Sequence, residues 1–267
     1  MTNSGTIGGF LGTSVPRIDG PDKTRGIAEY TPDVKLDGLL WGKILRSPYP
    51  HARILSIDTS KAKAVPGVHA VVTGEDTFKG ARYGRAIVDI PVLAQGVVRY
   101  VGEQVAAVAA DDETIAERAA QLIEVEYEQL PSVHDAEEAM QPSAPILHPD
   151  MLEYAGWPKP VETPANNYTS FDWAKGDVEA GLASADVIVE NTFITPRQHQ
   201  AYMEPHSCVV QFDEVGHLHA WQGNKSPHPA KRFIGIATGM ERDDITLHPV
   251  TIGGDFGGKG SVMPIPI

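Results

Sequence analysis

Apolar and polar positions alternate along much of the chain, and in one stretch they switch to helical spacing. Residues 97–110 are mostly apolar and are interrupted at Gly102-Glu103, which predicts two strands. Residues 111–123 carry apolar side chains on one helical face, with Asp111 or Asp112 placed to cap the helix. Those side chains are Ile115, Ala119, Leu122 and Ile123. Apolar residues then alternate with glutamates over residues 123–128, which predicts a half-buried strand.

Further strands are predicted on both sides of this unit. The expected elements of the first half are strands at 39–48, around Ile54 and Ile57, and after a Pro-Gly turn at 66–67. Those of the second half are a helix capped near Asp177, a strand at 187–193, a hairpin at 207–223, a helix at 227–240 that stops at Gly239, and a strand at 243–254. In the strand at 187–193, Val187, Val189 and Phe193 occupy alternate positions.

The succession of strand, helix and strand indicates an α/β or α+β layer rather than an all-helical protein. Residues 141–165 are rich in proline and show little periodicity, so we expect a linker there. The linker would separate a first domain over residues 1–140, with an extended and turn-rich lead-in, from a second domain over residues 166–267.

Composition narrows the class of protein. Hydrophobic residues make up 42% of the 267 residues and charged residues 21%, as in soluble proteins with a core. The formal net charge of -13 argues against nucleic acid or an anionic membrane as a partner. The longest apolar run, 105–110, is too short to span a bilayer, and the N-terminus has no secretory pattern, so we expect a cytoplasmic protein without membrane insertion. With Cys208 as its one cysteine, the chain alone cannot build a Cys-ligated iron–sulfur cluster.

A glycine-rich loop, "GGDFGGK", occupies residues 253–259 near the end of the sequence. Its spacing resembles a nucleotide-binding P-loop, but Gly260 stands where that motif needs Ser or Thr to ligate magnesium. The prolines of residues 261–267 also disfavour the helix that should follow. Paired glycines indicate either a tight turn or a backbone that something approaches closely, and the loop alone leaves both open.

Other candidate chemistry is weaker. His217 and His219 share one strand face, but no carboxylate pattern completes a metal site, and the sequence has no serine- or thiol-nucleophile motif. Cys208 is expected to be a small buried residue. Residues 196–209 are crowded with Arg, Gln, His and Glu around two apolar residues, which fits either a surface turn or the wall of a cavity.

Five stretches together resemble the molybdenum-binding large subunit of the xanthine dehydrogenase/aldehyde oxidase family, the molybdenum hydroxylases. They occupy residues 14–34, 42–76, 98–139, 176–206 and 253–259 in the family's order. The resemblance implies an α+β protein, in which an N-terminal α/β hammerhead domain is followed by the start of the first molybdopterin-binding domain.

The resemblance also implies an oxidoreductase activity, hydroxylation of an aldehyde or an N-heteroaromatic substrate with oxygen from water. Molybdenum-molybdopterin would be contacted by the glycine loop, and electrons would pass to 2Fe-2S and FAD groups on partner domains or subunits. The implied cofactor-binding residues are Lys225, Gly254, Phe256, Gly257 and Gly258. No direct metal ligand is assigned to this chain.

Two departures from the family pattern matter. Many members have glutamine at the position of Lys225, where its amide would bind a molybdenum oxygen. A lysine could donate to that oxygen, favour a more anionic ligand, recognise a carboxylate substrate, or point away. The family's catalytic glutamate lies well beyond Ile267, so no catalytic residue is assigned here, and we expect the chain alone to be inactive without the remaining molybdopterin-binding domains.

The sequence leaves competing functions open. The first is the N-terminal part of a hydroxylase catalytic subunit, either a fragment or a split subunit, with iron–sulfur and FAD subunits as partners. The second is a non-catalytic assembly or binding module with the same fold. A P-loop nucleotide binder is the third.

Overall fold

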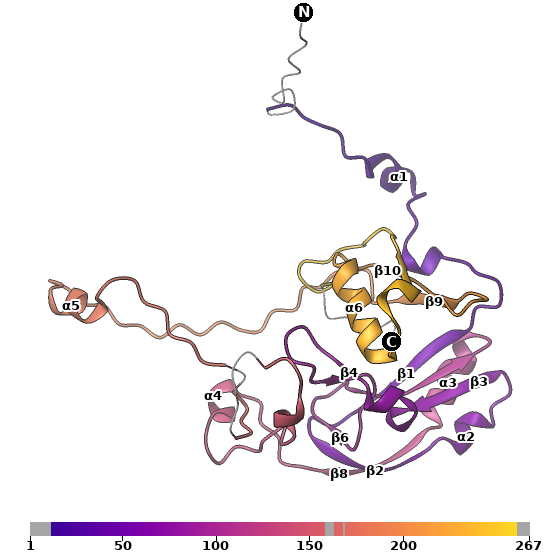
Figure 1. Cartoon of the computed structure of the whole chain (residues 1–267), viewed down its shortest axis with the longest axis horizontal. Coiled ribbons are helices and arrows are strands. Elements are labelled where there is room, and N and C mark those ends of the chain that lie inside the picture. Colours follow the sequence, from indigo (N-terminus) through magenta and orange to yellow (C-terminus); the bar gives the residue numbers. More distant parts are fainter. Residues whose placement is uncertain (1–11, 158–162, 168, 261–267) are drawn as a thin grey trace, which may run out of the picture.

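The chain folds around two groups of short strands, as a computed structural model shows for residues 12–157, 163–167 and 169–260 (Figure 1). In the first half, three strands form an antiparallel sheet in the order β1-β7-β3, namely β1 (Trp41–Arg46), β7 (Gln104–Ala110) and β3 (Val68–Thr73). Another antiparallel sheet has the order β6-β2-β8, with β6 (Val97–Val98), β2 (Ala52–Asp58) and β8 (Glu124–Gln129). Strands β4 (Arg82–Tyr83) and β5 (Ile90–Pro91) form a short antiparallel pair.

The predicted strand–helix–strand unit is confirmed. Helix α3 (Glu113–Gln121) begins directly after Asp112, whose carboxylate accepts a hydrogen bond of 2.7 Å from the N–H of Ile115. Buried alanines of β7 and α3 share one core cluster with Val71, Val108 and Ile123. The predicted pair of strands in 97–110 is also present, although β6 and β7 belong to different sheets.

Strand β8 has the predicted half-buried pattern. Val125 and Tyr127 are half-buried, whereas Glu124, Glu126 and Glu128, which alternate with them, are exposed. Two of these glutamates form surface ion pairs, Glu124 with Lys61 of helix α2 (Ser60–Lys63) and Glu128 with Arg53 of β2. The strand therefore buries one face and solvates the other, as a period of two requires.

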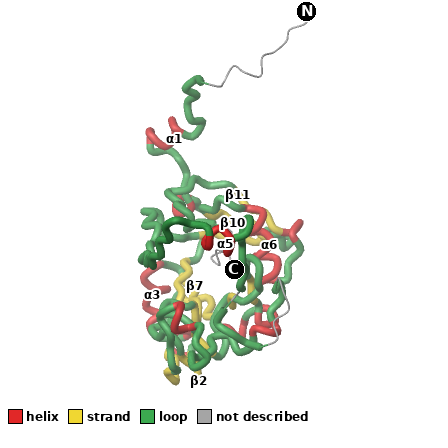
Figure 2. The backbone as a smooth tube through the Cα atoms, turned by 90° about the vertical axis from the view of Figure 1, so that its left-hand side faces the viewer, coloured by secondary structure: helices red, strands yellow, loops and turns green. Residues whose placement is uncertain are grey.

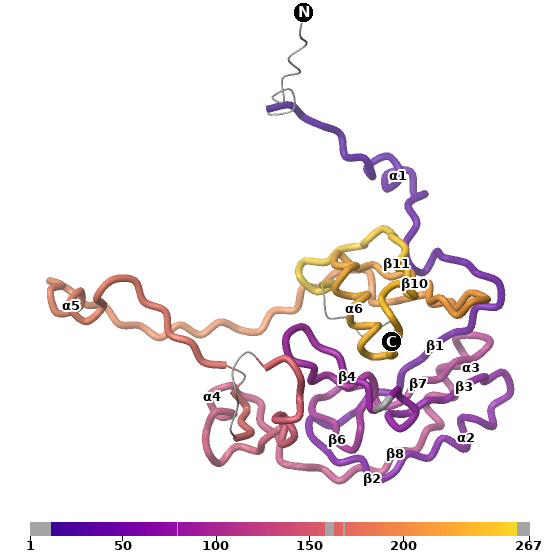
Figure 3. The backbone as a smooth tube through the Cα atoms, in the orientation of Figure 1, coloured from indigo at the N-terminus to yellow at the C-terminus, as the bar shows by residue number. Residues whose placement is uncertain are grey.

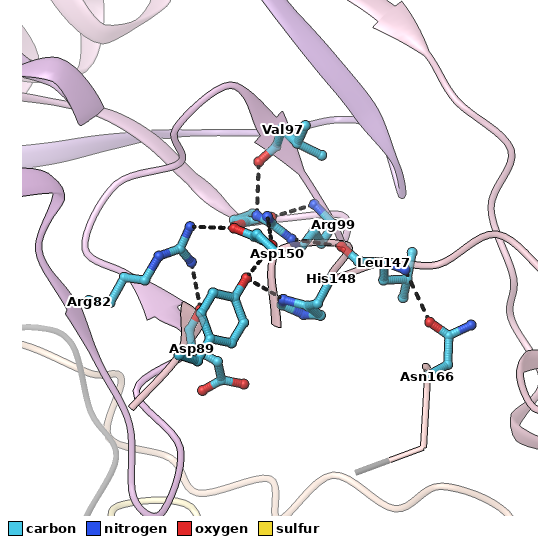
Figure 4. A network of polar contacts seen from close by, with 10 residues as sticks. Arg82, Asp89, Val97, Arg99, Leu147, His148, Asp150 and Asn166 are labelled. Carbon is cyan, nitrogen blue, oxygen red and sulfur yellow. Dashed lines mark hydrogen bonds and ion pairs between the residues drawn. The ribbon is translucent and has the colours of Figure 1, made fainter. Parts of the chain in front are cut away.

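The predicted linker segment makes ordered contacts with the first half of the chain. It follows helix α4 (Ala136–Ala139) and includes a 3₁₀ helix, Met151–Glu153. Met151 and Tyr154 are buried against Ile87. Asp150 accepts a hydrogen bond of 2.7 Å from Tyr154 and forms ion pairs of 3.5 Å with Arg82 and 3.9 Å with Arg99 (Figure 4). Whether 140 and 166 are domain boundaries stays a prediction.

The second half builds a three-stranded sheet in the order β11-β10-β9. Its elements are β9 (Cys208–Phe212), β10 (Leu218–Gln222), helix α6 (Pro227–Thr238) and β11 (Ile245–His248). Strands β9 and β10 form the predicted hairpin, and β10 is parallel to β11. The predicted helix is confirmed as well, with prolines in its first turn and Gly239 at its end in the left-handed conformation (φ 75°).

The prediction of a strand at 187–193 was wrong. The helix predicted near Asp177 is present as α5 (Val178–Ala183), with the Asp177 carboxylate as its cap. Helix α5 lies at the tip of a long arm, and the residues after it run extended and exposed along this arm back to the second group of strands (Figures 1 and 3). Val187, Val189 and Phe193 are 78%, 77% and 85% exposed. Alternation alone does not make a strand, because its backbone groups need a neighbouring strand, and no described strand lies beside this segment.

The N-terminal lead-in contacts the second group of strands instead of the first, through Tyr30 and Thr31. Helix α1 (Gly20–Arg25) projects away from the body (Figure 2). The chain then forms an isolated parallel bridge between Tyr30 and Thr251, and the N–H of Gly223 donates to the Thr31 hydroxyl at 3.1 Å. The remaining short 3₁₀ helices are Thr31–Asp33, Gly74–Asp76, Phe78–Gly80 and Arg242–Asp244.

The two groups of strands also pack directly against each other. Phe233 and Ala237 of α6 are buried against Tyr83, Val92 and Leu93. None of the helices in the described part of the chain has the length and apolar character needed to cross a membrane.

Candidate functional site

The parallel pairing of β10 and β11 brings two distant segments together. Lys225 follows the carboxyl end of β10, and the glycine loop 253–259 follows β11. Since the two strands are parallel and adjacent, both segments emerge at the same edge of the sheet. The N–H of Lys225 lies 3.4 Å from the carbonyl oxygen of Lys259. Ligands of α/β sheets commonly bind at this carboxyl edge, so we take it as the candidate site.

A single carboxylate shapes the outer part of the glycine loop. Asp255 accepts hydrogen bonds from Lys225 Nζ at 2.6 Å, from the N–H of Gly257 at 3.1 Å and from the N–H of Lys259 at 2.5 Å. The hydrogen bond from Lys225 is the main reason why the pKa of the Asp255 carboxyl is lowered. Three loop residues adopt positive φ angles, 104° at Gly254, 44° at Phe256 and 95° at Gly257. A loop with this path can expose its backbone amides to a ligand.

The inner side of the loop rests on residues 202–204. A Cβ atom at Gly253 would lie 2.6 Å from the Cβ of Glu204, and one at Gly258 would lie 2.3 Å from Tyr202 Cε1. Both distances are shorter than any tolerated contact, so these two glycines are required by the protein's own side chains. They carry no information about a ligand.

The outer side of the loop is open. A Cβ atom at Gly257 would meet no atom within 4 Å, and the Phe256 side chain is 76% exposed. Among the described residues, the N–H groups of Gly254 and Phe256 have no hydrogen-bond acceptor. Backbone donors beside the open position of Gly257 suit an electron-rich, oxygen-bearing group, which is the chemistry that a molybdopterin centre presents.

Lys259 is not available to such a ligand. Its side chain is 2% exposed, and its ammonium group forms an ion pair with Glu204 and lies 5.2 Å from the centre of the Tyr202 ring. In a P-loop the corresponding lysine reaches the phosphates, so its burial here argues against nucleotide binding. The helix that a P-loop requires would fall on residues 261–267, outside the described residues.

The five sequence-predicted site residues thus gather at one edge. Lys225 contacts the loop through Asp255, and Phe256 and Gly257 lie on its open side. Gly258 packs inward on Tyr202, and a Cβ atom at Gly254 would lie 3.2 Å from the Phe256 ring and 3.3 Å from the Cβ of Tyr202. Their contact with a cofactor stays a prediction. Sequence reasoning missed Tyr202, Glu204 and Lys259 as the support of the loop. The one available signal was the polar crowding of residues 196–209, which the sequence left open between a surface turn and a cavity wall.

Other chemical groupings in the described part of the chain do not form a second site. No group of three or more His, Cys, Asp or Glu side chains there is arranged to hold a metal ion. His219 and His248 are hydrogen-bonded at 2.9 Å and stack beside Trp221. Burial raises the pKa of the Cys208 thiol to about 12, which makes it a poor nucleophile. A hollow of about 600 Å³ between β2 and residues 73–76 is lined by none of the predicted site residues.

Comparisons with known proteins agree with this architecture. Residues 25–131 match the a/b hammerhead domain of aldehyde oxidase and xanthine dehydrogenase, and residues 160–267 match the molybdopterin cofactor-binding domain. The chain therefore comprises a hammerhead domain, followed by sequence that matches a molybdopterin cofactor-binding domain. The chain belongs to the xanthine dehydrogenase/aldehyde oxidase family, whose members are molybdopterin-dependent oxidoreductases.

Three relatives show the range of the family. The chain is 37% identical to a probable xanthine dehydrogenase subunit from Bacillus subtilis, over 91% of this chain and 31% of that protein. It is 36% identical to the carbon monoxide dehydrogenase large chain of Afipia carboxidovorans, over 93% of this chain and 31% of that protein. The solved structure of the aldehyde oxidoreductase from Desulfovibrio desulfuricans matches with a TM-score of 0.80 at 28% identity, over 91% of this chain and 27% of that one. The chain thus spans about a third of the length of these relatives.

Proposed function

We propose that this chain forms part of the catalytic subunit of a molybdenum hydroxylase. In this proposal the open side of the loop 253–259 contacts the molybdopterin centre through the backbone of Gly254, Phe256 and Gly257. The observation that carries it is the combination of backbone donors at Gly254 and Phe256 without an acceptor among the described residues, absent side-chain bulk at Gly257 and a loop held at the carboxyl edge of parallel strands. When bound, the molybdenum centre supplies the oxidative hydroxylation with oxygen taken from water.

The residues of this chain hold and orient that group. The amides of the loop act as oriented dipoles, and the lack of side-chain bulk at Gly257 lets the group approach the backbone. Lys225 stands at the same edge, where its ammonium group can donate a hydrogen bond beside Asp255. The resemblance implies a glutamine at this position in many family members, whose amide would be the donor there.

The substrate class that we propose is an aldehyde or an N-heteroaromatic compound. Support comes from the relatives named for xanthine, an N-heteroaromatic compound, and for aldehyde. The relative named for carbon monoxide takes a substrate outside this class. The pocket for the substrate and the catalytic base would come from parts of the subunit that this sequence does not include. Electrons would leave through 2Fe-2S and FAD groups on partner domains or subunits, because one cysteine cannot hold such a cluster. We further propose that the complex works in the cytoplasm.

Metal, pterin and flavin analysis of the complex purified from its native host tests this function. We expect molybdenum and pterin near one per complex, with iron and FAD carried by copurifying chains. A purified protein without molybdenum, pterin and partner chains would instead favour the non-catalytic assembly or binding module.

A further inference from the structure

A buried ion pair lies beneath the glycine loop, on the side opposite to the proposed cofactor. Lys259 is 1% exposed as a whole residue, and the Glu204 side chain is 12% exposed. Burying two charges costs more desolvation energy than an apolar pair of similar size, so such pairs are seldom explained by stability alone. The pair lies where the two ends of the loop meet, which points to a role in holding the loop.

One carboxylate oxygen connects both ends of the loop. Glu204 Oε2 accepts a hydrogen bond of 2.7 Å from the N–H of Gly253, the first loop residue. The same oxygen accepts from Nζ of Lys259, the last loop residue. The two ends of the loop are thereby held at one point, by a residue that lies far from both of them in the sequence.

The surroundings leave the carboxylate little freedom to move. The Tyr202 ring lies against Lys259 Nζ and fills the space of a Cβ atom at Gly258, and its hydroxyl is 2.5 Å from His206 Nε2. The other carboxylate oxygen, Glu204 Oε1, is buried without a hydrogen-bond partner among the described residues. A buried acceptor without a partner is costly, which indicates that the side chain is held where it is by its contacts to the loop.

We infer that Glu204 is the positioning residue of the cofactor loop, and that its ion pair with Lys259 sets the path on which the open amides of Gly254 and Phe256 depend. Glu204 acts through the loop and does not itself contact the cofactor. This inference rests on the proposed function for its ligand, but the geometry of the loop can be measured independently of any ligand.

The double variant Glu204→Gln/Lys259→Met, made in the assembled complex, tests the inference. It removes both charges together, so no buried charge is left unpaired, and glutamine keeps an acceptor for Gly253. The fold should therefore survive. We expect hydrogen exchange at the amides of Gly257, Gly258 and Lys259 to become at least tenfold faster, and molybdenum and pterin per complex to fall at least tenfold, while the melting temperature stays within a few degrees.

The matched control is the exposed ion pair Lys61–Glu124, which joins α2 to β8 far from the loop (Figure 3). Lys61→Met/Glu124→Gln should change neither the exchange rates nor the molybdenum content. The single variant Glu204→Asp retains the charge but is one methylene shorter, so it should lose one of the two contacts and show an intermediate effect.

The outcomes separate this inference from the proposed function. If the double variant folds and keeps wild-type exchange rates and molybdenum content, the ion pair does not position the loop. If the wild-type complex holds no molybdopterin, the proposed function fails, yet faster exchange in the double variant would still establish Glu204 as the residue that fixes the loop. Unfolding of the double variant would also contradict the inference, since the pair would then be needed for stability itself.

Discussion

The two sides of the loop 253–259 use the same residue type for different reasons. On the inner side, Gly253 and Gly258 are glycine because Glu204 and Tyr202 occupy the space of a side chain. On the outer side, Gly257 faces open space with a φ of 95°, so its glycine is explained by the backbone and by whatever approaches it. The number of glycines in such a motif therefore does not equal the number of ligand contacts. Only a glycine that faces open space can owe its presence to a ligand.

The largest effect is expected on the inner side. Gly258→Ala places a methyl group 2.3 Å from Tyr202 Cε1, and either the ring or the loop must move. We expect a loss of about 1–3 kcal/mol in the free energy of unfolding, as for other overpacked sites. Urea denaturation of the variant and the wild type measures this loss.

Gly42→Ala is the matched control, because a Cβ atom at Gly42 meets nothing within 4 Å. This control should change stability by no more than a few tenths of a kcal/mol. A double-mutant cycle with Tyr202→Ala should recover part of the loss at Gly258. Purely additive effects would mean that Tyr202 is not the residue that excludes the methyl group.

A substitution on the outer side should affect cofactor content more than stability. The Cβ atom of Gly257→Val would meet no atom within 4 Å, so we expect the fold to lose only the cost of a branched residue at positive φ, about 1–2 kcal/mol. In the assembled enzyme, however, the valine side chain would occupy the path by which the cofactor approaches. We expect molybdenum and pterin content to fall at least tenfold.

Gly216→Val is the control that distinguishes the effect of backbone strain in Gly257→Val from the effect of excluding the cofactor. Gly216 also has a positive φ, 85°, with no atom within 4 Å of a Cβ, but it lies in the β9–β10 turn at the other end of β10. Both variants should lose similar stability, and only Gly257→Val should lose molybdenum. Equal molybdenum contents in the two variants would place the cofactor away from this side of the loop.

Much of the fold could be predicted because its signals are local. The cap at Asp112, the helical face of α3 and the alternation in β8 each fall within a few residues, and all three are confirmed. The strand expected at 187–193 has the same alternation as β8, but β8 has β2 as its partner. Periodicity shows that a segment can pair, whereas the partner is a property of the tertiary structure.

In the candidate site, too, local features could be predicted from sequence and tertiary contacts could not. The loop and Lys225 could be found from sequence because glycine spacing is visible there and the resemblance names those positions. The contact between Glu204 and Lys259 could not, because it joins residues 55 positions apart and neither belongs to a pattern that includes the other. The sequence also assigned Gly257 and Gly258 to the ligand alike, and only the structure separates Gly258, which packs on Tyr202, from Gly257.

The pH dependence of the outer side follows from Asp255. Because Lys225 lowers the pKa of this carboxyl below its unfolded value, its contribution is present above the ordinary carboxyl range of about 4 and is lost as the pH falls through the lowered pKa. Asp255→Asn should speed hydrogen exchange at Gly257 and Lys259 several-fold at neutral pH. The difference from the wild type should shrink once the pH falls below that carboxyl range, with both proteins compared at each pH. A constant difference at all pH values would show that the charge of Asp255 is not what holds the loop.

The smallest effect is expected at Lys225, which is exposed and contacts the loop through one side-chain hydrogen bond. Lys225→Gln keeps a donor near Asp255 but removes the charge, so the melting temperature should change by about 1 °C or less, as for other exposed ion pairs. The pKa of Asp255, followed by NMR, should rise towards its ordinary value, and Lys225→Met should raise it further because no donor remains. If both variants leave this pKa unchanged, Lys225 does not bind Asp255, and its ammonium group is free to face the ligand on the open side of the loop.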